Sequence, residues 1–290
     1  MVLRKATSEE IDNSSYNPSE GQYLRVSKSS YMGYLMCPRQ YWWRYIADIP
    51  QPPPTDAMIR GSEIHSCLEN AYTKYDGSDF RNLLGGESGD TTLNALAQME
   101  EQRIAFWGDL EVIEAEVKHY LFDEEHEVVI VGMIDGVIRH PDGGIVIVEL
   151  KTGNMAAGKL TRTRKELCFY YNMLTALGHE NITHFMYLTP DCMNEKFLTD
   201  MMNSPKKEVY VGEEQGVSMI EKINGRSLSA FAKGYNTIIT SLKSRRWDMK
   251  WNDYFCPTWC DFNLACDAEL TGLCEPMFPE QNEMEMKHNE

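Results

Sequence analysis

The sequence contains no long hydrophobic segment. No apolar run approaches the roughly 20 residues that a membrane-spanning helix needs. The start of the chain, MVLRKATSEEIDNSS, lacks the apolar core of a signal peptide. Internal repeats are absent as well. We therefore expect an intracellular, cytoplasmic protein that has no membrane partner.

Basic residues are also scarce. The chain has 28 Lys and Arg against 44 Asp and Glu, a formal net charge of −16. This balance argues against a broadly basic, nonspecific nucleic-acid binder, because phosphate contacts require Lys and Arg. A local groove is still compatible with it, since basic residues cluster at 159 to 165 (KLTRTRK) and at 243 to 246 (KSRR). The alternative for each cluster is a solvated helix face.

Apolar residues, by contrast, are sufficient for a full core. They make up 42% of the 290 residues, enough for one large domain or two small ones. Residues 1 to 22 are polar and residues 276 to 290 are acidic. We expect both ends to be mobile.

The pattern of apolar residues predicts a mixed α/β core. Helices are expected at residues 29 to 46, 57 to 75, 92 to 107, 162 to 177 and 228 to 242. Strands are expected at residues 110 to 122, 128 to 138, 145 to 152 and 182 to 188, with an edge strand at 209 to 211. Residues 77 to 90 are Gly-rich and predicted to be a loop.

Two predicted strands, on either side of the sequence HPDGG, should form a hairpin that carries Asp135, Glu149 and Lys151. A loop of residues 141 to 143 places the two carboxylates directly opposite each other. The strand period of two then places Lys151 on their face. A two-residue turn would instead send the carboxylates to opposite faces.

These three side chains suit a metal-dependent phosphodiesterase. Carboxylate oxygens are hard ligands for Mg²⁺ or Mn²⁺. A lysine ammonium beside the metal could hold the attacking water or stabilise charge in the transition state. The alternative is a charged solvent face on a surface hairpin.

Three further residues could complete such a site. His65, in GSEIH, could supply a nitrogen ligand. Glu166 and Tyr170 are spaced by four on a predicted helix and share one face, which could point at the metal. Packing is the alternative role for each.

Cysteine is well represented, with eight residues. In a reducing compartment, eight cysteines indicate metal binding or catalysis rather than disulfides. Cys256, Cys260 and Cys266 form a C-x3-C-x5-C run, which departs from zinc-ribbon spacing. A fourth thiolate, from Cys37 or Cys274, would complete an iron-sulfur cluster. The other three cysteines lie in apolar patterns and are expected to be inert core thiols: Cys67, Cys168 and Cys192.

Six segments follow one another in a family-specific order: SKSSYMGYLMCPRQYWWRY, GSEIH, GMIDGV, VELKTG, ELCFYYNML and CPTWCDFNLAC. In this order the chain resembles the RecB-like branch of the PD-(D/E)xK nucleases. Within that branch it is similar to the iron-sulfur members: CRISPR-associated exonucleases, the AddB nuclease domain and phage-encoded relatives. The resemblance implies one restriction-endonuclease-like domain over residues 23 to 275, with a mixed sheet flanked by helices.

The resemblance also implies roles for the hairpin residues. His65, Asp135 and Glu149 would bind Mg²⁺ or Mn²⁺ together with the backbone carbonyl of Leu150. Lys151 would be the catalytic lysine. The Asp and Glu would thus serve both metal binding and catalysis.

Tyr170 would match the catalytic-site tyrosine of the family's Gln-x-x-x-Tyr motif. Glu166 stands where the family has glutamine, and a carboxylate repels phosphate, so a DNA contact at this position is placed in question. Five basic residues are expected to contact phosphate: Arg39, Arg44, Lys159, Arg162 and Arg164. Three aromatic residues could stack on bases or be buried near the cluster: Trp42, Trp43 and Tyr45.

By the same resemblance, Cys37, Cys256, Cys260 and Cys266 would bind an iron-sulfur cluster of the 4Fe-4S type. The family commonly separates its first C-terminal pair by two residues, whereas three separate Cys256 from Cys260. Such a cluster would join the N-terminal helix to the C-terminal segment.

Taken together, the residues and the resemblance predict a Mg²⁺- or Mn²⁺-dependent DNA exonuclease acting on single strands or DNA ends. Recombination, repair, replication and CRISPR adaptation are the processes it implies. The acidic composition suggests protein partners within such a complex. The alternative is a non-catalytic DNA-end-binding or assembly module, against which the complete Asp, Glu and Lys set argues.

Overall fold

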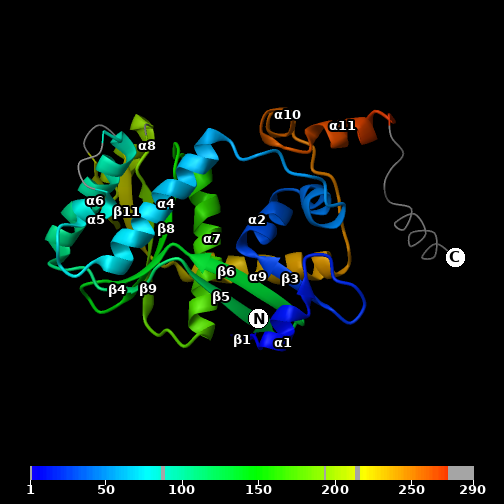
Figure 1. Ribbon diagram of the computed structural model, residues 1–290, viewed down its shortest axis with the longest axis horizontal. Helices are drawn as coiled ribbons and strands as arrows, with labels where there is room; N and C mark the ends of the chain where they lie inside the picture. The colour runs from blue at the N-terminus through cyan, green and yellow to red at the C-terminus, as the bar shows by residue number, and fades with distance from the viewer. Residues whose placement is uncertain (1, 86–88, 193, 213–215, 274–290) are drawn as a thin grey trace. The chain divides into compact units, whose positions relative to one another are not determined.

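The computed structural model describes residues 2–85, 89–192, 194–212 and 216–273 (Figure 1). The chain divides into two compact units. The first contains the described residues up to Tyr31 together with Pro54–Ser244, and the second contains Met32–Pro53 and the described residues from Arg245 onward. The second unit thus combines two segments that are far apart in the sequence. The single nuclease domain expected over residues 23 to 275 stays a prediction.

The first unit contains a five-stranded sheet with the order β1-β5-β6-β3-β2. The pairs β1–β5 and β5–β6 are antiparallel, whereas β3–β6 and β2–β3 are parallel. Its strands are β1 (Leu3–Lys5), β2 (Ser14–Ser15), β3 (Tyr23–Ser27), β5 (Val117–Asp123) and β6 (Val128–Ile134).

A second sheet of six strands has the order β10-β11-β9-β8-β7-β4. The central pair β8–β9 is parallel and the other pairs are antiparallel. Its strands are β4 (Val112–Glu114), β7 (Gly136–Arg139), β8 (Ile145–Leu150), β9 (Ile182–Thr189), β10 (Lys207–Val211) and β11 (Val217–Lys222). Only Asp135 separates β6 from β7, so the chain passes from one sheet to the other at this residue.

Helices cover both faces of the strand β8. Val146, Val148 and Leu150 belong to a core cluster with α4 (Asp56–Lys74), α5 (Phe80–Leu84) and α6 (Thr91–Trp107). Because alternate residues of a strand face opposite sides, Glu149 faces the other way. That side is covered by α7 (Ala157–Ala176), which also packs against α9 (Gly225–Lys243). This placement confirms the mixed α/β core expected from the sequence.

Residues 2 to 22, for which mobility is predicted, contain three short elements of secondary structure. They form β1, α1 (Ser8–Asp12) and β2, and β1 pairs with β5. Thr7 and Glu10 form a capping box at the start of α1, and Arg4 pairs with Glu10 at 2.6 Å. Elements of two to five residues carry no detectable hydrophobic periodicity, so the sequence pattern did not indicate them.

The helix expected at residues 29 to 46 is interrupted. It consists of α2 (Lys28–Met36), α3 (Pro38–Tyr41) and a π-helix, η1 (Trp42–Ile46). Pro38 begins α3, and proline disfavours a helical conformation in the residue before it, which accounts for the break at Cys37. The elements that the sequence pattern did not indicate include α5, in the expected loop, α8 (Glu195–Met202) and β11. The expected acidic tail, residues 276 to 290, lies outside the described residues.

The second unit joins the end of α2, α3 and η1 to α10 (Phe255–Trp259) and α11 (Asn263–Leu270). The rings of Tyr41 and Trp247 stack at 5.6 Å. The hydroxyl of Tyr34 donates to the carbonyl of Arg246 at 2.7 Å. Segments more than 200 residues apart therefore share one core. None of the helices in the described part of the chain is long and apolar enough to cross a membrane.

Candidate functional site

The site begins at the β7–β8 hairpin, whose register is the one that a three-residue loop requires. Gly136 pairs with Val148, and the N–H of His140 donates to the carbonyl of Gly144 at 2.8 Å. The loop is therefore residues 141 to 143, and Gly143 has a φ of 85°, which glycine adopts without strain. This confirms the register that sets Asp135 opposite Glu149.

The two carboxylates lie on one face and are both buried, with Asp135 6% and Glu149 1% exposed. Asp135 Oδ2 accepts a hydrogen bond from the N–H of Leu150 at 2.7 Å. Nδ1 of His65, on α4, lies 3.6 Å from Asp135 Oδ1 and 3.2 Å from Glu116 Oε1. His65, Glu116 and Asp135 each offer one ligand atom, and these three atoms lie within 4.8 Å of one another.

Glu149 is held through one of its two oxygens. Oε1 accepts from Lys151 Nζ at 2.5 Å and from Lys28 Nζ at 2.9 Å. Oε2 is buried and has no hydrogen-bond partner among the described residues. A buried carboxylate oxygen without a partner is costly, and a bound cation would relieve that cost.

The electrostatics of the two carboxylates differ. Burial and the neighbouring Glu149 raise the pKa of Asp135 to about 7. Burial alone would also raise the pKa of Glu149, but Lys28 and Lys151 together hold that pKa well below its usual range. Glu116 and Asp135 outweigh burial and raise the pKa of His65. The potential is therefore positive at Glu149 and negative at His65.

These donors fit a hard divalent cation. Asp135 Oδ1 and the unpartnered Glu149 Oε2 are carboxylate oxygens, and the imidazole of His65 is a ligand that Mn²⁺ accepts. His65 and Asp135 border a cavity of about 600 Å³, whose lining also includes Lys28, Glu116 and Tyr170, whereas Glu149 lies behind this lining. A cavity of this size can accommodate a nucleotide-sized group. The carbonyl of Leu150 stays a predicted ligand.

The α7 side chains complete the site from the other side. Lys151 Nζ donates to Glu166 Oε2 at 2.6 Å as well as to Glu149. The buried hydroxyl of Tyr170 donates to the carbonyl of Met133 at 2.5 Å, so the ring braces β6. A Cβ at Gly132 would lie 3.1 Å from this ring. Glu166 and Tyr170 thus both face the site, as their spacing of four suggested.

Sequence reasoning missed two residues of the site, Lys28 and Glu116. Lys28 lies within SKSS, in the first of the six motif segments, and Glu116 lies in the strand predicted at residues 110 to 122. Its φ of 51° is unusual for a residue other than glycine. Neither residue has a spacing relation to the hairpin that a sequence pattern could detect.

The three basic candidates in the first unit differ in accessibility. Arg164 is engaged in a two-point ion pair with Glu221, at 2.6 and 3.0 Å. Lys159 Nζ lies within 3.4 Å of the carbonyls of residues 152 to 154, and burial lowers its pKa. The side chain of Arg162 is 47% exposed and lies 3.6 Å from Glu166. Arg162 is the most available of the three to a phosphate.

In the second unit, Arg39 pairs with Glu269 at 2.8 Å and is 9% exposed. Arg44 is 37% exposed and lies 3.4 Å from Asp261. Trp42 and Trp43 are buried, which favours the packing role over base stacking for these rings.

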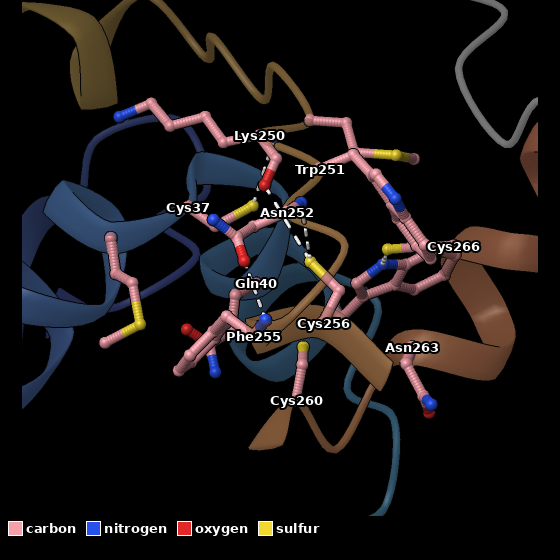
Figure 2. Close-up of a pocket in the computed structure, with 13 residues that line it drawn as sticks. Cys37, Gln40, Lys250, Trp251, Asn252, Phe255, Cys256, Cys260, Asn263 and Cys266 are labelled. Carbon is pink, nitrogen blue, oxygen red and sulfur yellow. Dashed lines mark hydrogen bonds between the residues drawn. The ribbon is translucent and has the colours of Figure 1, made fainter. Parts of the chain in front are cut away.

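All four cysteines expected to bind an iron-sulfur cluster line one cavity of about 380 Å³ in the second unit (Figure 2). Two backbone N–H groups and one indole point at the sulfurs. The N–H of Asn252 lies 3.2 Å from Cys256 Sγ, that of Lys250 lies 3.5 Å from Cys37 Sγ, and Trp43 Nε1 lies 3.2 Å from Cys266 Sγ. Cys274 lies outside the described residues.

The thiols of this cavity are shielded from solvent and lie near N–H donors. Burial raises the pKa of Cys266 to about 11 and also raises the pKa of Cys260. A coordinated metal would deprotonate them, and N–H donors stabilise thiolate sulfur. Cys168 and Cys192 are buried in the first unit, in agreement with the role expected for core thiols.

Comparison with known proteins identifies the class. A model of the PD-(D/E)XK nuclease superfamily matches residues 25–267. The chain therefore belongs to the PD-(D/E)XK nuclease superfamily, which suggests metal-dependent nuclease activity. A search of curated proteins found no match. A solved structure described as that of SSO0001 is similar at 15% identity, over 84% of this chain and 86% of that one, with a TM-score of 0.35.

Proposed function

We propose that this protein is a Mg²⁺- or Mn²⁺-dependent deoxyribonuclease that acts as an exonuclease on single-stranded DNA or DNA ends. The observation that carries the proposal is the carboxylate pair. Glu149 Oε2 is buried and unpartnered among the described residues, and it belongs to the residue that the register sets opposite Asp135. Superfamily membership supplies the nuclease class and implies DNA as substrate.

In this proposal His65, Asp135 and Glu149 hold the metal. When bound, a divalent ion lowers the pKa of a water ligand and polarises the phosphodiester. Lys151 is held between Glu149 and Glu166, from where its ammonium can orient the attacking water or stabilise charge on the phosphoryl oxygens. Tyr170 keeps β6 in place through Met133, next to Asp135.

We also propose that Cys37, Cys256, Cys260 and Cys266 bind a 4Fe-4S cluster. Their common cavity and the N–H groups aimed at three of the sulfurs support it. The role would be structural, because the ligands come from the two segments that build the second unit. The order of the motifs further favours a role in recombination, repair, replication or CRISPR adaptation, in cellular or phage DNA metabolism, with protein partners.

The decisive experiment compares wild type with Lys151→Ala on end-labelled linear single- and double-stranded DNA, with Mn²⁺, with Mg²⁺ and with chelator. We expect wild type to degrade single strands or ends only with metal. Lys151→Ala should reduce the rate by about 100-fold or more, the usual loss when a transition-state cation is removed. Lys233→Ala, an exposed lysine on α9, serves as the matched control and should keep wild-type activity.

Circular single-stranded DNA distinguishes exonuclease from endonuclease activity, because a circle has no end. Resistance of the circle with rapid loss of the linear strand is the expected result. Equal degradation by wild type and Lys151→Ala, or by neither, would contradict the catalytic assignment.

A further inference from the structure

The candidate site contains a second lysine, Lys28, to which the proposed mechanism assigns no role. Its Nζ lies 2.9 Å from Glu149 Oε1 and 3.6 Å from Glu166 Oε2. It also lies 5.2 Å from the centroid of the Tyr170 ring. Lys28 and Lys151 therefore share one carboxylate oxygen, and both approach the same second carboxylate.

The backbone holds Lys28 firmly in this position. It is the first residue of α2, and the flanking Ser27 and Ser30 exchange hydrogen bonds of 2.9 and 3.1 Å between side chain and backbone N–H. The ring of Tyr31 packs against Phe169 of α7 at 5.7 Å. The start of α2 is thus fixed from both sides of Lys28, so its side chain needs little reorganisation to reach Glu149.

Charge balance shows why one lysine is not enough. Lys151 Nζ lies 2.5 Å from Glu149 and 2.6 Å from Glu166, whose side chains are 1% and 8% exposed. One ammonium between two buried carboxylates leaves a negative charge uncompensated, which is costly in a buried site. Arg162 lies at the same distance from Glu166 as Lys28, 3.6 Å, but its side chain is 47% exposed against 20% for Lys28, so solvent screening weakens its contribution. Lys28 supplies the second positive charge.

We propose that Lys28 is a positioning residue that compensates Glu166. Its ammonium binds Oε1 of Glu149, which leaves Oε2 for the metal. By offsetting the negative charge of Glu166, it also weakens the ion pair between Glu166 and Lys151, so that Lys151 can act on the substrate. The kinetic part of this inference rests on the proposed nuclease function, whereas the charge coupling between Lys28 and Glu166 does not. The requirement for Lys28 should therefore depend on the charge at position 166.

A double-mutant cycle tests this dependence with Lys28→Met, Glu166→Gln and the double variant. Steady-state kinetics on linear DNA with Mn²⁺ and thermal melting of the chelated protein are measured for all four proteins. Lys28→Met should lower kcat about tenfold in the wild-type background and less than about threefold in the Glu166→Gln background. Lys28→Met should also lower the Tm by about 4 °C or more in the wild-type background, and by less in the Glu166→Gln background. Lys28→Arg should behave nearly as wild type, and Lys233→Met controls for the loss of an exposed lysine.

Each result decides for or against the proposal. Equal effects of Lys28→Met in both backgrounds, on kcat and on Tm, would overturn it. A rise in KM of the same size in both backgrounds would identify Lys28 as a phosphate contact instead, which also overturns it. If Lys28→Met does not fold, recovery of folding in the double variant supports the coupling, and failure of the double variant refutes it.

The two proposals can fail separately. If wild type has no nuclease activity under any condition, the proposed function is wrong, and the melting cycle alone still decides the coupling. If wild type is active and the cycle shows no coupling, only the role of Lys28 is wrong.

Discussion

Asp135→Asn should make the metal-free protein more stable while removing its response to metal. Burial and Glu149 raise the pKa of Asp135 from 3.8 to about 7. Between these values the folded protein binds a proton that the unfolded chain has released. The stability contributed by this proton is therefore fully present below about pH 4 and is lost as the pH rises through 7.

The size of the effect follows from the same two values. A carboxyl whose pKa rises from 3.8 to about 7 costs about 4 kcal/mol of stability once both states are ionised. Asparagine carries no charge, and its carbonyl can still accept the hydrogen bond from the N–H of Leu150. We expect a gain of about 1–4 kcal/mol at pH 8, or a Tm higher by about 5 °C, and no gain near pH 4.

Scanning calorimetry at pH 4 and pH 8, with chelator and with Mn²⁺, measures both halves of the prediction. Saturating Mn²⁺ at about 100 times its Kd should stabilise wild type by about 2.7 kcal/mol and leave the variant unchanged. Asp200→Asn, at an exposed position of α8, is the matched control. A lower Tm for Asp135→Asn in chelator at pH 8, or a retained Mn²⁺ shift, would refute the reasoning.

Three other predictions follow from separate parts of the fold. Glu221→Gln breaks the two-point ion pair with Arg164, so the variant should lose about 1–3 kcal/mol of unfolding free energy at pH 7. Because the pKa of Glu221 is lowered in the folded protein, thermal melts of the variant should approach those of wild type as the pH falls below about 4. Anaerobically purified wild type should contain iron and absorb at about 400 nm, and Cys260→Ser should reduce both whereas Cys67→Ser should leave both unchanged. Bound zinc without iron, and without this absorbance, would contradict the cluster. Gly132→Ala places a Cβ 2.5 Å from Met173 Sδ, so denaturant titration should show a loss of about 1–3 kcal/mol.

The hairpin was predictable from sequence because its determinants are local. Turn residues fix the loop, the loop fixes the register, and the strand period then fixes the faces of Asp135 and Glu149. The long helices α4, α6 and α9 were likewise found within a few residues, since each repeats its apolar pattern over several turns.

The contributions of Lys28 and Glu116 could not be predicted in this way. Lys28 reaches Glu149 across 121 positions of the sequence, and Glu116 reaches His65 across 51. These contacts depend on how β3 and β5 are arranged beside β6, and no local pattern encodes that arrangement. A charged residue in a polar stretch looks the same whether it faces solvent or a buried site.

The hairpin loop of residues 141 to 143 constrains how the chain can change in length. Exposed loop tips generally tolerate insertions and deletions. At this tip, however, a change in length is compatible with the site only if the loop itself absorbs it. A slip of one residue in the pairing of β7 and β8 would turn Asp135 or Glu149 to the opposite face. Functional variants of this loop should therefore keep Gly136 paired with Val148, whatever their length.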